Sequence, residues 1–417
     1  MRDRNGVCRC FRITGYFALA CLLCAFPALV FGQQNALTAR VADSAMERWP
    51  NGHIGAKDAT VSWGFEPGIV LAGFNAVWNA THDPRYLNYI QQAVNQFVTV
   101  DGAIRTYDSQ VYSLNNILIG RQLLALYRAT GDERYRKAAN TLHEQLLHQP
   151  RTASGGYWHT RATPDLMLLD DTFMFAPFLA EYAATFRQPK DLDEIAVQFG
   201  LLAEHTRDAK TGLLYHGWDE SRRRSWVDKT TGTSSTLWAR GMGWYLMALV
   251  DTLPYLSPTD PQRAILIGIL QRTAASVVRA QDPDSGLWYQ VLDKPGQPEN
   301  YIESSSALMF TYALAKGARL GYLPASDRAS AMRAWGAVRK RFVEVTPQGN
   351  VKITGTVTHI GLGASPRDDG SYSYYLHAPV VSDDPKGVGA FLLAATEIEF
   401  RGGRSSAVRT AASRSTH

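Results

Sequence analysis

The chain has 417 residues, of which 45% are hydrophobic and 11% aromatic, so it is long and apolar enough for one large domain or two ordinary ones. Its formal net charge of +5 comes from the two ends of the chain, where Arg residues cluster before residue 33 and after residue 400. The body between them is slightly acidic, which excludes the basic surface that is typical of nucleic-acid-binding proteins.

Residues 1–32 are typical of a secretory signal peptide. A basic start with four Arg precedes an apolar run from Tyr16 to Phe31, and Val30-Phe31-Gly32 fits a cleavage motif. We therefore expect export to the periplasm or the medium, with no stable membrane association after cleavage. Because the apolar run is long for a signal, an uncleaved membrane anchor stays open, and lipidation at Cys21 is a weaker alternative.

The cysteines all lie in this expected signal, at positions Cys8, Cys10, Cys21 and Cys24. An exported chain without further cysteines forms no disulfide and offers neither a Cys nucleophile nor a Cys-based metal site. No His pair stands at helical i, i+4 spacing with a Glu, so neither a metal nor a cofactor is expected. Residues 401–417 are small, polar and basic, which predicts a disordered tail.

The body, residues 33–400, predicts a single all-α domain made of repeated helical hairpins. Residues 73–90 and 123–139 each contain an apolar helix, a Thr-x-Asp-x-Arg-Tyr turn and a second amphipathic helix, and Thr81 and Thr130 stand 49 residues apart. Hairpins of this length bury their apolar faces only by stacking on one another. The connecting loops are rich in Gly, Trp and charge, as if they converged on one site, which favours closure into a barrel of six hairpins over an open solenoid. The same plan continues in residues 177–199, 244–270 and 307–335.

Two adjacent carboxylates, Asp170 and Asp171, open an otherwise apolar stretch that runs from Leu166 to Tyr182. One Asp at such a position can cap the helix that follows. Two neighbouring carboxylates in an apolar setting repel each other, so one of them should take up a proton. A carboxylic acid that stays protonated near neutral pH can act as a general acid, and the pair is therefore the candidate catalytic site. The helix is predicted by the apolar spacing of Met174, Pro177, Phe178 and Tyr182.

Two further loops carry candidate binding residues. His216 lies between aromatic residues beside a glycine turn, where a structural and a functional role are equally open. The stretch from Trp238 to Trp244 places Arg240 among glycines just before an apolar helix. Arg is the natural partner of a substrate carboxylate, and Trp faces are good platforms for sugars.

The last polar stretches surround Trp288, Glu303 and Lys386. Glu303 could pair with Arg240, cap a helix or act as a second acid. The glycine cluster around Lys386 resembles a phosphate cradle, but it lacks the Lys-Ser/Thr that follows in a P-loop, so we exclude nucleotide binding.

Taken together, these motifs resemble the unsaturated rhamnogalacturonyl hydrolases of glycoside hydrolase family 105, and more distantly the unsaturated glucuronyl hydrolases of family 88. The similarity runs from Trp63 to Phe400, and its motifs are LDDTFMFAPFLAEY, GLLYHGWDE, WARGMGWY, GLWYQVLD, NYIESSSALMFTYALAKG and DPKGVGAFLLA. It implies a six-hairpin (α/α) barrel fold. It also implies a substrate with a C4=C5 double bond in its non-reducing uronic acid, as a polysaccharide lyase leaves it. In this chemistry an Asp protonates C4, water adds at C5, and the resulting hemiketal opens and expels the next sugar.

The resemblance also implies roles for individual residues. Spacing to Met174 favours Asp170 as the proton donor, with Asp171 close behind. His216 and Arg240 would hold the uronate, and Trp238 and Trp244 would line the sugar site. The other expected substrate contacts are Asn115, Trp288, Glu303 and Lys386.

Two positions depart from the family pattern and leave the exact substrate open. Asn115, followed by Asn116, stands where the family usually carries an Asp; an amide can position a hydroxyl but cannot serve as an acid. Met242 replaces the usual Asn between the two glycines that follow Arg240, which removes a polar contact.

Three alternatives remain beside a rhamnogalacturonyl hydrolase. One is an unsaturated glucuronyl hydrolase that acts on other lyase products. Another is a conventional inverting glycosidase, with Asp170 or Asp171 opposite Glu303 or Asp219. The third is a carbohydrate-binding helical-repeat protein without catalytic activity, which the substitution at Asn115 favours.

Overall fold

A computed structural model of the chain describes residues 36–55, 61–363, 365 and 367–402. The expected signal peptide, residues 1–32, and residues 403–417 of the expected tail lie outside the described residues. Arg401 closes a π-helical turn, Glu397–Arg401, so the regular structure extends slightly beyond the predicted boundary at residue 400. None of the helices in the described part of the chain is long and apolar enough to cross a membrane.

The structure is dominated by helices, with short strands in the connections. The helices are α2 (Leu37–Arg48), α3 (Phe65–Thr81), α4 (Pro84–Asn95), α5 (Gly120–Thr130), α6 (Glu133–Leu147), α7 (Asp171–Phe186), α8 (Lys190–His205), α9 (Ala239–Thr252), α10 (Pro261–Arg279), α11 (Ser304–Arg319), α12 (Ala325–Arg341), α13 (Tyr372–His377) and α14 (Pro385–Thr396). The strands are β1 (Leu166–Leu168), β2 (Gly217–Asp219), β3 (Val343–Val345), β4 (Val351–Ile353), β5 (Thr356–Val357) and β6 (Val380–Val381).

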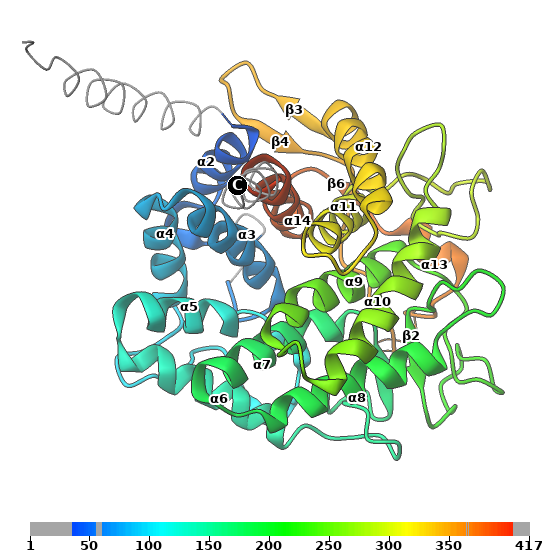
Figure 1. Cartoon of the computed structure of the whole chain (residues 1–417), viewed down its shortest axis with the longest axis horizontal. Coiled ribbons are helices and arrows are strands. Elements are labelled where there is room, and N and C mark those ends of the chain that lie inside the picture. The colour runs from blue at the N-terminus through cyan, green and yellow to red at the C-terminus, as the bar shows by residue number, and fades with distance from the viewer. Residues whose placement is uncertain (1–35, 56–60, 364, 366, 403–417) are drawn as a thin grey trace, which may run out of the picture.

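The long helices form two concentric rings. The inner ring runs α3, α5, α7, α9, α11 and α14, and α14 returns to pack on α3 (Figure 1). Each inner helix has an outer partner, in the same order α4, α6, α8, α10, α12 and α2. The last pair joins the two ends of the chain, since the blue α2 lies beside the red α14 in Figure 1. This confirms the prediction of an (α/α) barrel closed by six helical hairpins.

The residue pattern of each helix matches its ring. The inner helix α7 is buried at every position from Asp171 to Ala183, as expected of a helix that is apolar all round. The outer helix α4 buries one face only, because its apolar residues recur at intervals of three and four. The buried residues of α4 are Tyr86, Tyr89, Ile90, Ala93 and Val94.

The repeated Thr-x-Asp-x-Arg-Tyr turn makes the same hydrogen bonds in both hairpins that contain it. Thr81 donates its hydroxyl to a carbonyl one turn earlier and accepts the backbone N–H of Asp83, whose carboxylate then caps α4 at Arg85. Thr130 and Asp132 repeat these contacts at the start of α6. The turn therefore ends one helix and begins the next, which is why it is a reliable hairpin signal.

Two of the inner helices approach closely where both carry glycine. A Cβ on Gly389 of α14 would lie 2.6 Å from the carbonyl oxygen of Ile69 in α3, and a Cβ on Gly73 would lie 2.7 Å from the Cβ of Leu392. The glycine cluster around Lys386 thus serves helix packing at the point where the ring closes.

The short strands were not expected from the sequence, and they build the connections on one end of the barrel. Strands β1 and β2 join the segment before α7 to the segment before α9. The other strands belong to an insertion between α12 and α14, residues 343–381, in which β3 pairs with β4 and β5 with β6.

Candidate active site

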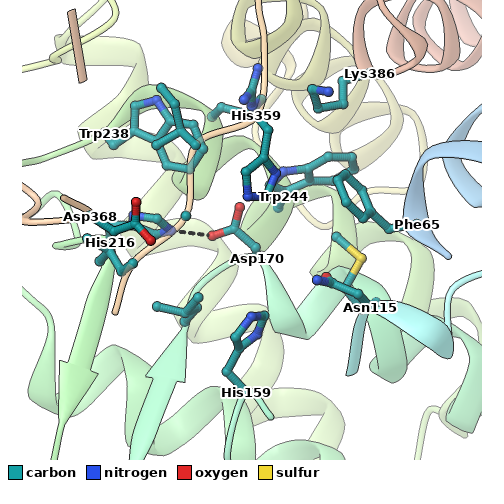
Figure 2. Close-up of a pocket in the computed structure, with 16 residues that line it drawn as sticks. Phe65, Asn115, His159, Asp170, His216, Trp238, Trp244, His359, Asp368 and Lys386 are labelled. Carbon is teal, nitrogen blue, oxygen red and sulfur yellow. Dashed lines mark hydrogen bonds and ion pairs between the residues drawn. The ribbon is translucent and has the colours of Figure 1, made fainter. Parts of the chain in front are cut away.

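A cavity opens at the end of the barrel where the inner helices begin (Figure 2). Four inner helices contribute lining residues at their N-terminal ends. These are Phe65 of α3, Asp170 just before α7, Arg240 of α9 and Lys386 of α14. Helix N-termini carry partial positive charge and free backbone N–H groups, so their convergence favours an anionic ligand. The remaining lining residues are Asn115, His159, Leu168, Met174, His216, Trp238, Trp244, His359, Ile360, Gly361, Leu362 and Asp368.

The β1–β2 pairing brings Asp170 and His216 together. Leu168 pairs with Gly217, and the backbone N–H of Leu169 donates to the carbonyl of His216. The next residue along, Asp170, then has its Oδ2 atom 2.7 Å from Nε2 of His216, as Figure 2 shows. The other ring nitrogen of His216, Nδ1, lies 2.6 Å from the hydroxyl of Tyr375, and His216 is 0% exposed.

The charge state of Asp170 differs from the expectation. Burial alone raises the pKa of this carboxyl, but the charge and hydrogen bond of His216 outweigh burial, and the pKa lies below its ordinary value. The prediction that one of the two carboxyls is protonated therefore does not apply to Asp170 in the protein alone, because a histidine stands beside its carboxylate.

Asp171 does not line the cavity, which corrects its prediction as a second catalytic group. Its carboxylate accepts the backbone N–H of Leu168 at 3.2 Å and lies 2.7 Å from Nδ1 of His159. It is His159 that lines the cavity instead. Burial lowers the pKa of His159, but the neighbouring charge of Asp171 prevails and the pKa is raised.

Arg240 lines the cavity, but its guanidinium already has partners. Its two terminal nitrogens donate to the carbonyl oxygens of Val357 and Thr358 at 2.5 and 2.6 Å. These bonds anchor the segment that leads into the cavity wall at residues 359–362. A contact between Arg240 and a uronate stays a prediction. In the structure Arg240 acts as a clamp, because its guanidinium holds the backbone next to this wall.

The two tryptophans of the α9 motif both line the cavity. Trp238 is enclosed by the ring of His216 at 4.6 Å, the ring of Tyr375 at 5.4 Å and the guanidinium of Arg240 at 4.9 Å. Trp244 packs on Phe173 at 5.1 Å. Because both side chains are almost fully buried, they contribute shape to the cavity and offer no open face as a platform.

Two predicted substrate contacts lie away from the cavity, and their roles are structural. Trp288 is buried and donates its indole N–H to the carbonyl of Val277 at 2.7 Å. Glu303 caps α11 by accepting the backbone N–H of Ser306 and also accepts the N–H of Val357. Its carboxylate also lies 3.9 Å from the guanidinium of Arg240. Of the three roles predicted for Glu303, the helix cap and the pairing with Arg240 therefore apply.

Asp219 does not line the cavity either. It is buried and accepts hydrogen bonds from the backbone N–H and the hydroxyl of Ser221. A two-carboxylate arrangement of Asp170 with Glu303 or Asp219 is therefore wrong. The second carboxylate that does line the cavity is Asp368, which the sequence did not single out.

The remaining predicted positions divide as follows. Asn115 lines the cavity from a single 3₁₀ turn, and Lys386 lines it while its Nζ pairs with Glu66 and Asp384, each at 2.9 Å. Met242, the second departure from the family pattern, is buried and does not line the cavity, and its sulfur accepts the N–H of Leu214 at 3.4 Å.

Several cavity residues were missed because tertiary contacts alone mark them. His159 was within reach of the sequence, since it follows a loop rich in Gly, Tyr and Trp. His359 and the residues after it carry no local signal. Among the described residues, no three His, Cys, Asp or Glu side chains lie close enough to hold a metal ion.

Comparison with known proteins agrees with this architecture. A family model described as Glycosyl Hydrolase Family 88 matches residues 37–401. A solved structure of a family 105 glycoside hydrolase from Clostridium acetobutylicum superimposes with a TM-score of 0.83 and 38% identity, covering 88% of this chain and 99% of the other. An unsaturated glucuronyl hydrolase from Bacillus sp. GL1, at 16% identity, 89% and 97% coverage and a TM-score of 0.65, shares the fold.

Relatives were also found by sequence, among them a protein of Agrobacterium fabrum and one of Bacillus subtilis. The protein Atu3128 of Agrobacterium fabrum is 40% identical over 230 residues, which cover 54% of this chain and 97% of that protein. The unsaturated rhamnogalacturonyl hydrolase YesR of Bacillus subtilis is 27% identical over 265 residues, which cover 62% and 72%. The chain is therefore a glycoside hydrolase that belongs to glycosyl hydrolase family 88, with family 105 proteins among its relatives of known structure.

Proposed function

We propose that this chain releases the 4,5-unsaturated uronic acid from the non-reducing end of lyase-generated oligosaccharides, and that its substrates are the unsaturated galacturonyl-rhamnose fragments of pectin. The observation that carries the proposal is the state of Asp170 in the cavity. One carboxylate oxygen is held by His216, and the other, Oδ1, has no hydrogen-bond partner among the described residues. A carboxyl group held at one oxygen and open at the other is suited to hand a proton to a bound substrate.

The proposed reaction is a hydration. Protonated Asp170 gives its proton to C4, the electron pair of the C4=C5 bond forms the new C–H bond, and positive charge develops at C5 and the ring oxygen. Water adds to C5 and returns a proton to Asp170. The C5 hemiketal opens to a ketone, which leaves a hemiacetal at C1. Its collapse to an aldehyde expels the next sugar as an alcohol, so one water is consumed and the acid is regenerated.

Substrate binding would supply the condition under which Asp170 is protonated. The uronate brings a negative charge next to Asp170, and a like charge raises the pKa of a carboxyl group. Binding of an anion in the cavity is supported by the helix N-termini that converge on it and by Arg240 and Lys386, which line it.

Pectin as the source of the substrate is supported by the likeness to YesR, named an unsaturated rhamnogalacturonyl hydrolase. Export is part of the same proposal. It rests on the signal-like residues 1–32 and suits an enzyme that takes up the products of an extracellular or periplasmic lyase.

The test is the ultraviolet absorbance of the conjugated C4=C5 uronate, followed after addition of purified protein. Decay with unsaturated rhamnogalacturonan disaccharide, and slower decay with unsaturated glucuronyl disaccharides, is the expected result. Faster decay with the glucuronyl substrates would keep the chemistry and overturn the pectin assignment. Stable absorbance with both would overturn the hydration proposal.

The presence of Asp368 in the cavity makes conventional hydrolysis of a saturated glycoside the second candidate function, since such enzymes use two separated carboxylates. Release of reducing sugar from saturated pectin oligosaccharides, with no decay of the unsaturated chromophore, would favour it. Binding of the unsaturated disaccharide without turnover of any substrate would instead identify a carbohydrate-binding protein.

A further inference from the structure

Tyr375 contacts His216 at Nδ1, the ring nitrogen that does not face Asp170. It belongs to α13, in the insertion between α12 and α14, and its hydroxyl lies 2.6 Å from Nδ1 of His216. Both side chains are fully buried, and Gln290 fixes the backbone of Tyr375 by donating to its carbonyl at 3.0 Å. The order Tyr375, His216, Asp170 is thus a chain of two short hydrogen bonds that ends in the cavity.

The direction of these bonds follows from the chemistry of the phenol. Burial, together with the nearby charge of Asp170, raises the pKa of Tyr375 well above its ordinary value, so the hydroxyl keeps its proton. A charged His216, which lowers the pKa of Asp170, has N–H on both ring nitrogens. In its neutral form it has one N–H and one acceptor nitrogen, and the bond made by one nitrogen decides where the proton sits on the other. If the phenol donates to Nδ1, the proton of His216 must be on Nε2, and Nε2–H donates to Oδ2 of Asp170.

This arrangement also determines where Asp170 can carry a proton. Oδ2 already accepts from Nε2–H, so a transferable proton has its place on Oδ1. Figure 2 shows this second oxygen pointing away from His216. In the other tautomer, with the proton on Nδ1, Nε2 becomes an acceptor and Asp170 would hold its proton on Oδ2, directed into the protein.

We propose that Tyr375 is a positioning residue which, by donating to Nδ1, fixes His216 in the Nε2–H tautomer and so places the proton of Asp170 on the oxygen that faces the substrate. The inference rests on the proposed role of Asp170 as proton donor, while the tautomer itself can be tested without any substrate.

Other titratable or charged groups lie around the hydrogen bonds that join Tyr375, His216 and Asp170. Tyr374 and Asp369 lie beside Tyr375, and Arg240 acts on Asp170 through its charge. From the other elements packed around the site come His359 and Asp368 of the cavity wall, Lys386 of α14, and the His159–Asp171 pair. Among the residues that the structure describes, Tyr375 alone makes a hydrogen bond with Nδ1 of His216.

The decisive experiment compares Tyr375→Phe with Tyr245→Phe. Tyr245 of α9 is an equally buried tyrosine that does not line the cavity, and its hydroxyl donates to the carbonyl of Phe199 at 2.8 Å, so it controls for the loss of a buried hydroxyl. The ¹⁵N chemical shifts of ¹⁵N-histidine-labelled protein report the tautomer of His216, with His216→Gln used to assign its signals. An ionised Asp170 accepts from Nε2–H whatever stands at Nδ1, so the tautomer is compared with Asp170→Asn present, whose neutral amide can accept from Nε2–H or donate to Nε2. In that background we expect Nε2–H beside Tyr375 and with Tyr245→Phe, and conversion toward Nδ1–H with Tyr375→Phe. Nδ1–H beside Tyr375, or an unchanged tautomer with Tyr375→Phe, would overturn the proposal.

The enzymatic activity of the Tyr375→Phe variant is a second, independent test of the proposal. General acid catalysis contributes about 10²- to 10⁴-fold, so misdirecting the proton should lower kcat of Tyr375→Phe by at least about tenfold. The fall of kcat at high pH should move to higher pH, because Asp170 would then face a lone pair of Nε2 and hold its proton more tightly. A lower kcat with an unmoved pH profile would assign Tyr375 a merely structural role. If the wild type turns over no unsaturated substrate, the proposed function fails while the tautomer measurement still decides this inference.

Discussion

Asp170 and Asp171 are neighbours in the chain, yet each carboxylate pairs with its own histidine at 2.7 Å, Asp170 with His216 and Asp171 with His159. Successive residues at the start of a helix point about 100° apart, as the 3.6-residue turn requires. Asp170 therefore lies in the cavity, while Asp171 lies beneath the cavity wall and presents His159 to it. The repulsion expected from the sequence is relieved because the two groups have separate partners.

This separation predicts unequal effects of two isosteric substitutions. Asp170→Asn removes the proposed acid and should lower kcat by about 10²- to 10⁴-fold. Asp171→Asn keeps an acceptor for the backbone and disturbs only the orientation of His159, so a measurable rate should remain, with a raised KM. The decay of the unsaturated chromophore measures both. Equal loss in the two variants would contradict the assignment of distinct roles.

The fold could be predicted from the sequence because its signals are local. The Thr-x-Asp-x-Arg-Tyr turn around Thr81 and Thr130 ends one helix and caps the next by contacts within a few residues. The inner and outer helices differ in apolar periodicity, which is also a local property. Ring closure was predicted from the connecting loops, whose Gly, Trp and charged residues are expected to converge on one site, rather than from any single motif.

The site was predicted only in part because its geometry depends on pairings between distant segments. Strands β1 and β2 have three residues each, too few to show alternation, yet they decide that Asp170 meets His216. Glu303 and Trp288 looked functional because a capping carboxylate and a buried indole N–H have the same local sequence as a binding residue. Their partners, Ser306 and Val277, became evident only in three dimensions.

Arg240 should act on substrate affinity through the cavity wall that it clamps. In Arg240→Lys a single ammonium group cannot reproduce the two divergent bonds to Val357 and Thr358, and one buried carbonyl loses its donor. We expect a raised KM and a loss of about 1–3 kcal/mol in the free energy of unfolding. The matched control is Arg263→Lys, since Arg263 also holds two carbonyls but lies on the outer helix α10; there the stability should fall with KM unchanged. An unchanged KM in Arg240→Lys would argue against the clamp.

A buried ion cluster at the opposite end of the inner helices should make stability depend on acid. Asp251 lies 2.7 Å from Arg121 and 2.6 Å from both Lys316 and Tyr312. Burial raises the pKa of Asp251, but the charges of Lys316 and Arg121 outweigh it, and the pKa lies far below its ordinary value.

A carboxyl group with a lowered pKa stabilises the folded state above its unfolded pKa of about 3.9, and this contribution is lost as the pH falls from there toward the folded pKa. Asp251→Asn should therefore lower the free energy of unfolding by about 3–5 kcal/mol near pH 7 and flatten its acid dependence below pH ~4. Urea denaturation at several pH values measures both effects. Asp132→Asn, at a cap where Asn serves equally well, is the control and should change neither.

The closure of the ring should depend on the glycine contact between α3 and α14. A methyl group at Gly389 would meet the carbonyl of Ile69 at 2.6 Å, and backbone in a packed helix cannot move aside as a side chain would. Gly389→Ala should therefore lower the free energy of unfolding by about 1–3 kcal/mol, the usual cost of overpacking. Gly336 of α12 is the matched control: a methyl group there would have no neighbouring atom within 4 Å, so Gly336→Ala should stabilise the helix by about 0.5–1 kcal/mol. Thermal denaturation of the two variants compares the same substitution with opposite expected signs, and a stabilised Gly389→Ala would show that α3 and α14 are free to separate without loss.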